Sequence, residues 1–288
     1  QVVALSTAQI SLGLSTAQVV ALSTDQAANL TTDQINLGLS TAQVAVMETR
    51  DIAALTTVNV AALTTAQVRQ GLGTSQLVGL TTAQVTALTT SQIALGLSTT
   101  QVVALTTTQV AQGLTTAQIN LGLSTAQVAV METRDIAALS TAQVQQGLTT
   151  AQVVALTTAQ ARALTTAQIR LGLSPAQVAA MDTVDLAQLN SAQIGALSGA
   201  GLAGLSTTQL VNLGTSQVAS LTADQLNALS TNQIVAMTTA QAGALTSSQV
   251  AGMLADQLTA MQTEDVAALS TAAVNAMSAV QVKALTTA

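Results

Sequence analysis

The sequence lacks Phe, Trp, Tyr, His and Cys entirely, and it contains a single proline among 288 residues. Without thiol or imidazole groups, the chain has no Cys or His nucleophile, no His general base, no Cys/His metal site and no disulfide. These absences argue against most classes of enzyme, so we expect neither catalysis nor a bound cofactor. A chain without cysteine is compatible with any redox compartment, and cysteine usage therefore does not localise it.

Charge is also scarce, with 6 basic and 12 acidic residues and a formal net charge of -6. So few basic residues, spread over the whole length, do not form the positive patch that nucleic acid requires, and no aromatic ring is present for stacking on bases. The mean hydropathy is positive, at +0.53. Polar residues nevertheless interrupt every apolar stretch well before 18 residues, so we expect no membrane span.

What the chain does have is one phrase, Leu-Ser/Thr-Thr-Ala-Gln-Val, which recurs every eight or nine residues from Leu5 to Leu285. Each repeat opens with Leu or Met, which we call the anchor. A strict short period of this kind indicates a stack of small structural repeats. We therefore expect residues 1–288 to form one continuous array.

A single repeat carries its own helix start signal, as the segment from Leu14 onwards shows. Ser15 is an N-cap residue, and Gln18 follows at the third helical position, N3, which is the spacing of a capping box. Leu14 precedes the cap and Val19 occupies N4, so these two apolar side chains can form a hydrophobic staple. The sole proline, Pro175, falls at the first helical position, where no amide hydrogen is needed.

Glycine is the extra residue of the nine-residue repeats and directly precedes the next anchor, as Gly38 does. A left-handed glycine at that point would end one helix and turn the chain into the next. We expect this role for Gly13, Gly38, Gly71, Gly96, Gly113, Gly122, Gly147 and Gly172.

These features predict an all-α solenoid of very short helices, about six or seven residues each. One continuous helix is excluded because an eight-residue period would carry the anchors around all sides. A parallel β-solenoid is the alternative, since Val, Ile and Thr are plentiful.

The nine-residue repeats often recur at intervals of 25 residues, which predicts three repeats, or 24–25 residues, per coil. Two repeats per coil is the alternative. In a three-repeat coil, the anchors and N4 residues would face the axis, and the Thr and Gln side chains would face water. After Leu173 every repeat has eight residues, so we expect the coil geometry to change near residue 173.

Acidic residues occur in pairs within a variant repeat, and the second acid of each pair replaces the N3 glutamine. Carboxylates at this spacing are candidate calcium ligands, whereas the alternative role is a favourable negative charge in the first turn of a helix. The pairs are Glu48 and Asp51, Glu132 and Asp135, Asp182 and Asp185, and Glu264 and Asp265.

The LSTAQV and LTTAQV phrases resemble the Ala/Thr/Gln/Leu-rich repeat regions of very large bacterial surface or secreted proteins, which are often labelled adhesin-like or haem-utilisation-like. The resemblance covers the whole chain and implies an extracellular or cell-surface location. Because the chain lacks His, Tyr and Cys, no haem ligation is expected.

We expect a structural protein that forms a filament, fibre or stalk by self-association or by continuing a longer repeat chain. The terminal QVVAL and LTTA segments look as though they were cut from such a run. The alternative is an adhesive module whose Thr/Gln face binds glycans or surfaces.

Overall fold

The computed structural model describes residues 2–285, and every regular element among them is a short helix. The predicted all-α solenoid is confirmed, and the β-solenoid alternative is wrong. The chain divides into two compact parts, Gln1–Leu148 and Thr149–Ala288, which we call the N-terminal and C-terminal parts and describe separately. Among residues 2–285, no helix combines the length and apolar character needed to cross a membrane.

The N-terminal part combines α-helices with π-helices. Its elements are η1 (Val2–Ala4, a 3-10 helix), η2 (Gln9–Gly13), α1 (Thr16–Val20), α2 (Thr24–Ala28), η3 (Gln34–Gly38), α3 (Thr41–Val46), α4 (Thr49–Ala54), α5 (Thr57–Ala62), η4 (Gln67–Gly71), α6 (Thr74–Gly79), α7 (Thr82–Ala87), η5 (Gln92–Gly96), α8 (Thr99–Ala104), η6 (Gln109–Gly113), η7 (Gln118–Gly122), α9 (Thr125–Ala129), α10 (Thr133–Ala138) and η8 (Gln143–Gly147).

The C-terminal part has one π-helix near its start and α-helices thereafter. Its elements are α11 (Thr150–Val154), α12 (Thr158–Ala163), η9 (Gln168–Gly172), α13 (Pro175–Ala180), α14 (Thr183–Gln188), α15 (Ser191–Gly195), α16 (Gly199–Ala203), α17 (Thr207–Val211), α18 (Thr215–Ala219), α19 (Ala223–Asn227), α20 (Thr231–Ala236), α21 (Thr239–Gly243), α22 (Ser247–Gly252), α23 (Ala255–Thr259), α24 (Thr263–Ala268), α25 (Thr271–Asn275) and α26 (Ala279–Leu285).

A capping box marks the start of most of the helices. In α1, the Gln18 N–H donates to Ser15 Oγ at 3.3 Å, and the Ser15 N–H donates to Gln18 Oε1 at 2.9 Å. This exchange satisfies donors that a helix start otherwise leaves free. Pro175 opens α13 behind the cap residue Ser174, at a position that has no amide partner to lose.

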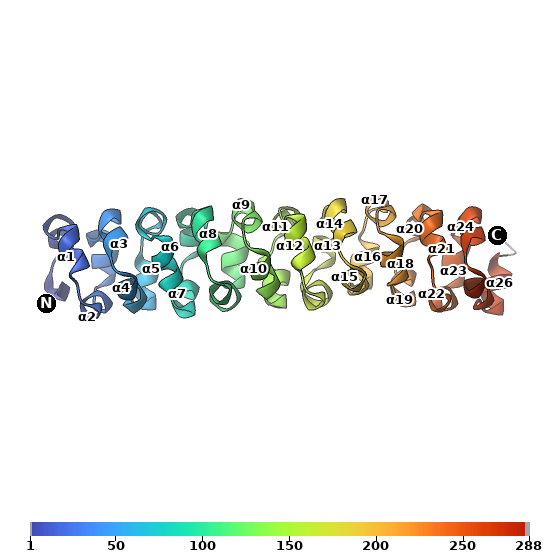
Figure 1. Cartoon of the computed structure of the whole chain (residues 1–288), viewed down its shortest axis with the longest axis horizontal. Coiled ribbons are helices and arrows are strands. Elements are labelled where there is room, and N and C mark those ends of the chain that lie inside the picture. The colour runs from blue at the N-terminus through green and yellow to red at the C-terminus, as the bar shows by residue number, and fades with distance from the viewer. Residues whose placement is uncertain (1, 286–288) are drawn as a thin grey trace. The chain divides into compact units, whose positions relative to one another are not determined.

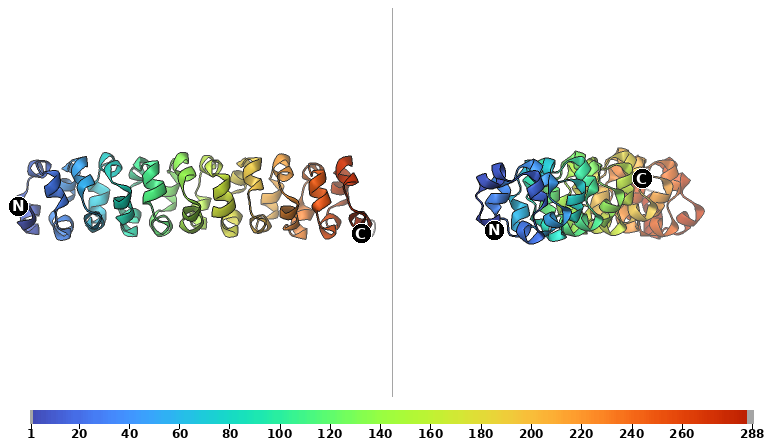
Figure 2. Two further views of the ribbon diagram at one scale, coloured as in Figure 1. Left: turned by 90° about the horizontal axis from the view of Figure 1, so that it is seen from below. Right: turned by 60° about the vertical axis from the view of Figure 1, so that its left-hand side comes forward.

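Three consecutive repeats complete one turn of the solenoid. In the N-terminal part α3 packs on η4, and in the C-terminal part α21 packs on α24, so contacting helices lie three repeats apart. Within each part, Figures 1 and 2 show successive coils side by side along the chain. Helices of five or six residues are unstable alone, and these contacts with neighbouring coils supply the missing stability.

Anchors and N4 side chains form the core. Val44 at N4 is fully buried at 0% exposure, and the anchor of the same repeat, Leu39, is 5% exposed. The staple spacing read from the sequence therefore places both apolar residues of a repeat inside the coil. The methionine anchors are buried in the same way, as Met47 shows at 3% exposure.

The expectation of left-handed corner glycines is wrong, because no glycine among the described residues has a positive φ. Each nine-residue repeat instead absorbs its extra residue in a π-helix that ends at the glycine. The Leu39 N–H donates at 2.8 Å to the carbonyl oxygen of Gln34, five residues earlier, so Gly38 lies inside a widened final turn.

Glycine is needed there because the backbone passes close to the preceding coil. A Cβ atom built on Gly71 would lie 3.0 Å from Cβ of Val44, and one on Gly38 would lie 3.3 Å from Cβ of Ile10. The constraint at these positions is steric contact between coils, and backbone conformation plays no part in it. After Gly172, where the nine-residue repeats end, the described helices are all α.

Candidate functional site

The N3 glutamine is the polar group that links one coil to the next. In its own repeat, Gln43 Oε1 accepts the Ser40 N–H at 2.8 Å. In the preceding coil, Gln43 Nε2 donates to the carbonyl oxygens of Ile10 at 2.9 Å and Leu14 at 2.8 Å. One amide group thus caps the start of its own helix and satisfies carbonyl groups at the end of an earlier one.

This arrangement repeats along both parts of the chain. Gln101 donates to Val68 and Leu72 in the N-terminal part, and Gln241 donates to Leu210 and Leu213 in the C-terminal part. We call the resulting row of amides the glutamine ladder. Its members with both kinds of bond resolved are Gln34, Gln43, Gln67, Gln76, Gln84, Gln92, Gln101, Gln109, Gln118, Gln127, Gln143, Gln193, Gln209, Gln217, Gln225, Gln233, Gln241, Gln249 and Gln281.

The prediction that the Gln side chains face water is wrong. Gln43 is 3% exposed and Gln101 is 4% exposed, because each amide lies between coils. A signal for this burial was present in the sequence. Glutamate fills the N3 position of a capping box as well as glutamine does, yet this chain never uses Glu at N3, and only glutamine adds a donor.

Burial of the ladder also weakens the adhesive alternative, which relied on an exposed Thr/Gln face. The buried amides already bond to backbone groups and are not available to a glycan or a surface. Apart from the two ends of the array, the outer surface consists mostly of Thr, Ser and Ala. It also carries isolated large apolar side chains, such as Leu121 at 72% exposure and Leu37 at 69%.

Two repeats with unusual cap residues receive help from the coil before them. Leu254 occupies a cap position, but its side chain cannot accept a hydrogen bond. Its N–H donates to Asn227 Oδ1 at 2.9 Å, and Asn227 Nδ2 donates to the Gly252 carbonyl oxygen. Gln262 Nε2 donates to the carbonyl oxygen of Val235 at 3.0 Å. Bonds between coils therefore compensate for weak local caps.

In the first acidic pair, the half-exposed carboxylate of Glu48 forms an ion pair with Arg50. Arg50 Nε lies 2.6 Å from Glu48 Oε2 and 3.9 Å from Asp51 Oδ1. Asp51 is fully buried and accepts a hydrogen bond from the Thr24 hydroxyl at 3.0 Å, whereas its Oδ2 has no hydrogen-bond partner. The two acids of this pair thus occupy different environments.

The second pair repeats this arrangement. Glu132 pairs with Arg134, and Asp135, which is 1% exposed, accepts the Thr107 hydroxyl at 2.6 Å. Burial raises the pKa of Asp135 above its ordinary value. The Thr107 hydrogen bond and the Arg134 charge act in the opposite direction, and Glu132 adds to the rise.

The remaining pairs also combine one exposed and one buried acid. Asp185 is 5% exposed and Asp265 is 2% exposed, while Asp182 and Glu264 face outward. Among residues 2–285, no three acidic side chains come together in a group that could hold a metal ion. In the described part of the chain the candidate calcium ligands therefore lie in pairs, and their binding of calcium stays a prediction.

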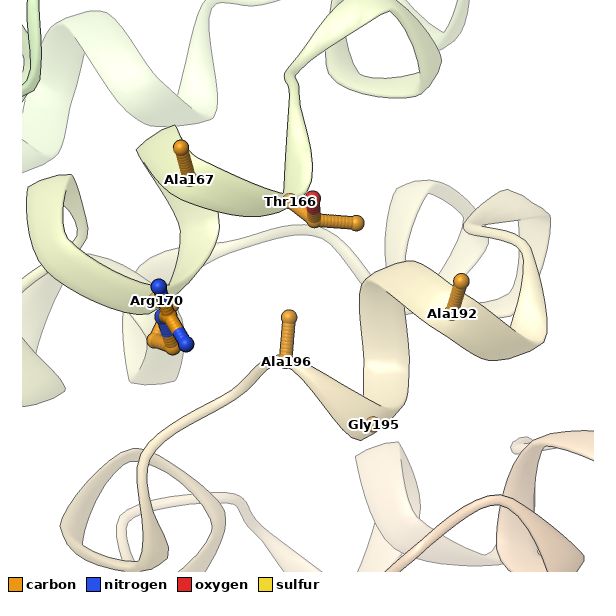
Figure 3. A pocket seen from close by; sticks show the side chains of 6 residues that line it. All are labelled: Thr166, Ala167, Arg170, Ala192, Gly195 and Ala196. Carbon is orange, nitrogen blue, oxygen red and sulfur yellow. The ribbon is translucent and has the colours of Figure 1, made fainter.

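A cavity of about 330 Å³ lies in the C-terminal part, beside η9 and α15 (Figure 3). It lies where a nine-residue repeat is followed, one coil later, by an eight-residue repeat. Figure 3 shows Ala196 directed towards the space between Thr166 and Arg170. No described acidic side chain forms an ion pair with Arg170. The lining residues are Thr166, Ala167, Arg170, Ala192, Gly195 and Ala196.

The helical coils and the buried amide ladder define the chain as a repeat protein of the α-solenoid class. Four of its segments match the family model of the ALTTAQ repeat, at residues 44–70, 199–231, 224–254 and 258–288. The matched segments lie in both parts of the chain.

Other comparisons add little to the family match. No curated protein shows significant similarity to the chain. Among solved structures, the leucine-rich repeat-containing protein LegL7 from Legionella pneumophila is similar over 86% of this chain and 87% of that one. The identity is 10% and the TM-score is 0.18, so this likeness carries no argument about fold or function.

Proposed function

We propose that the chain is a non-enzymatic structural module that extends by adding coils, either within a longer polypeptide or end to end with further copies, to form a filament or stalk. The observation that carries this proposal is the polarity of the glutamine ladder. Every laddered coil donates amide hydrogens to the coil before it and offers backbone carbonyl oxygens to the coil after it.

The first and last described coils each have one face that no further described coil covers. Gln9 and Gln18 bond to their own cap residues, and none of the described residues accepts a hydrogen bond from their Nε2 groups. At the other side, the N4 residues Val274 and Val282 are 43% and 46% exposed, whereas N4 residues inside the array are buried. A further coil would satisfy the amides on one side and cover the valines on the other.

The low charge of the chain agrees with this role, because little electrostatic repulsion opposes contact between copies. The extracellular or cell-surface location is supported by the resemblance to bacterial surface repeat regions. The non-enzymatic part of the proposal is supported by the composition, which offers no His or Cys for catalysis.

Negative-stain imaging of the purified full chain tests the proposal. We expect fibres of uniform width whose length grows with protein concentration. Replacing Gln9, Gln18 and Gln26 by Glu should abolish them, because carboxylates would then face the carbonyl oxygens of the incoming copy. The matched control places the same three charges at the exposed positions Ala8, Ala17 and Ala21.

Separate particles at every concentration would overturn end-to-end assembly. Fibres that survive the Gln-to-Glu substitutions would show that association uses another surface. A control variant that also loses its fibres would attribute the effect to net charge and would remove the ladder from the explanation.

A further inference from the structure

Aspartate replaces the laddered amide at four N3 positions, and each of these carboxyl groups is buried. The residues are Asp51, Asp135, Asp185 and Asp265. An ionised carboxylate accepts hydrogen bonds and donates none. It therefore does not reproduce the donor half of the glutamine bond to the preceding coil.

Asn59, in the repeat after Asp51, shows how far a side chain of this length reaches. Its Nδ2 donates to the carbonyl oxygen of Leu30 at 2.8 Å, across a sequence separation of 29 residues, and Asn59 is 4% exposed. Asparagine and aspartate have the same shape. A side chain as short as aspartate is thus long enough to bridge two coils from the N3 position.

Leu22 stands in the same relation to Asp51 as Leu30 does to Asn59. Asp51 Oδ2 is buried without a partner, and none of the described residues donates to the Leu22 carbonyl oxygen. Asp265 Oδ2 is likewise buried without a partner, and no described group donates to the carbonyl oxygen of Met237 one coil earlier. In each case a single hydrogen between the carboxyl oxygen and the carbonyl oxygen would give both of them a hydrogen-bond partner.

The charges around Asp51 are few. On its own helix, α4, Arg50 pairs with the half-exposed Glu48 and lies 3.9 Å from Asp51 Oδ1. Helix α2, which packs against α4, carries Asp25 at an exposed position, and α6 on the other side carries no titratable group. Asp265 on α24 has Glu264 beside it, and α21 has no charged residue.

We propose that the N3 aspartates are proton-operated joints between coils, in which the neutral carboxyl group of Asp51 donates its O–H to the Leu22 carbonyl oxygen. Loss of this proton to solvent breaks the bond and leaves two buried oxygens without a hydrogen between them. The joint is therefore closed in acid and weakened at neutral pH, while the neighbouring glutamine joints do not respond to pH. The same exchange applies to Asp265 and Met237.

The environment of Asp135 supports this proposal independently, because burial raises the pKa of its carboxyl group despite the lowering effects of Thr107 and Arg134. The direction is that of a group whose neutral form is favoured by folding.

Hydrogen exchange of the full chain tests the proposal at the peptides that cover α2 and α4. After correction for the intrinsic chemical rate, we expect these amides in the native chain to open roughly tenfold more often than in Asp51→Asn at neutral pH, the factor expected for one unsatisfied buried polar group. The difference should shrink as the pH falls, and it should vanish in strong acid. Asn59→Asp should transfer the same acid dependence to α5, and Asp25→Asn is the exposed control.

Equal protection of the native chain and Asp51→Asn at both pH values would overturn the proposal and would indicate a water molecule in the gap. Greater protection of the native chain at neutral pH than in acid would also overturn it, because the Arg50 ion pair would then dominate. An Asn59→Asp variant that stays folded without acquiring acid dependence would contradict it as well. If that variant does not fold, the Asp51→Asn comparison alone decides.

Discussion

At the scale of the residue, glutamine is the side chain on which this fold depends most. Its Oε1 accepts a backbone N–H of its own repeat, and its Nε2 donates to backbone carbonyl oxygens of the preceding coil. Serine or threonine at the cap can be replaced by glycine, as at Gly73, where Gln76 Oε1 still accepts the Gly73 N–H at 2.7 Å. No other neutral side chain of this length combines both functions.

Replacing one ladder glutamine by an apolar residue of similar length should therefore be costly. Gln101→Met leaves the Ser98 N–H and the carbonyl oxygens of Val68 and Leu72 without partners. We expect a loss of about 3 kcal/mol in the free energy of unfolding, measured by urea denaturation of the full chain followed by circular dichroism. Gln70→Met, at an exposed glutamine of another repeat, is the control and should change little. Equal effects at the two positions would remove the ladder from the account of stability.

Asp135 gives a prediction of pH dependence whose sign follows from its environment. Its pKa is raised in the folded chain above the ordinary 3.8. At pH values between the unfolded and the folded pKa, folding is therefore accompanied by the uptake of a proton. The stability that this group contributes is complete below about pH 4 and is lost as the pH rises through the folded pKa. Asp135→Asn should raise the thermal midpoint at neutral pH and leave it nearly unchanged in acid. A variant less stable than the native chain at neutral pH would reverse the sign and contradict this prediction.

At the scale of the element, the helices are too short to persist alone, and each one depends on its caps and on the helix one coil away. The nine-residue repeats add a second dependence. Their π-helical final turn brings a glycine against a β-branched N4 residue of the preceding coil, as Gly71 meets Val44.

This contact predicts different outcomes for two equivalent glycines. Gly71→Ala should destabilise the chain by about 1 to 3 kcal/mol through overpacking, and Val44→Ala should relieve part of that loss in the double variant. Gly13→Ala has no atom within 4 Å of the new Cβ and should be neutral or slightly stabilising. Thermal denaturation of the four chains measures these effects. A large loss at Gly13 would favour a conformational role for glycine and would contradict the steric one.

The features that the sequence predicts correctly are those set by local chemistry or by periodicity. The Ser15 and Gln18 capping box lies within one turn of helix, and the 25-residue spacing counts repeats per coil. The burial of glutamine and the steric role of Gly38 depend on a neighbour about 28 residues away. A single repeat read by itself therefore places the Gln amide in water and assigns the glycine to a turn.

At the scale of the whole molecule, every described link between coils joins residues within about one coil of sequence. Stability is then a sum of repeat and nearest-neighbour terms, and lengthening the array requires no new kind of contact. The sequence tolerates Leu, Ile, Val and Ala at N4 and Leu or Met at the anchor for the same reason, because each site meets only the adjacent coils. This property supports a role in which length and repetition matter more than one specialised site.

The central claim, a coil of three repeats, is tested most directly by engineered disulfides, which the absence of native cysteine makes unambiguous. A Cβ on residue 38 would lie 3.3 Å from Cβ of Ile10, close to the separation found across a disulfide. We predict that the pair Ile10→Cys and Gly38→Cys forms an intramolecular bond on mild oxidation, detected by non-reducing mass spectrometry. The control pair is Ile10→Cys and Asn29→Cys, because Asn29 is the last residue of the repeat that a two-repeat coil would place against Ile10; this pair should remain reduced. Rapid bonding of the second pair and not the first would contradict the three-repeat coil.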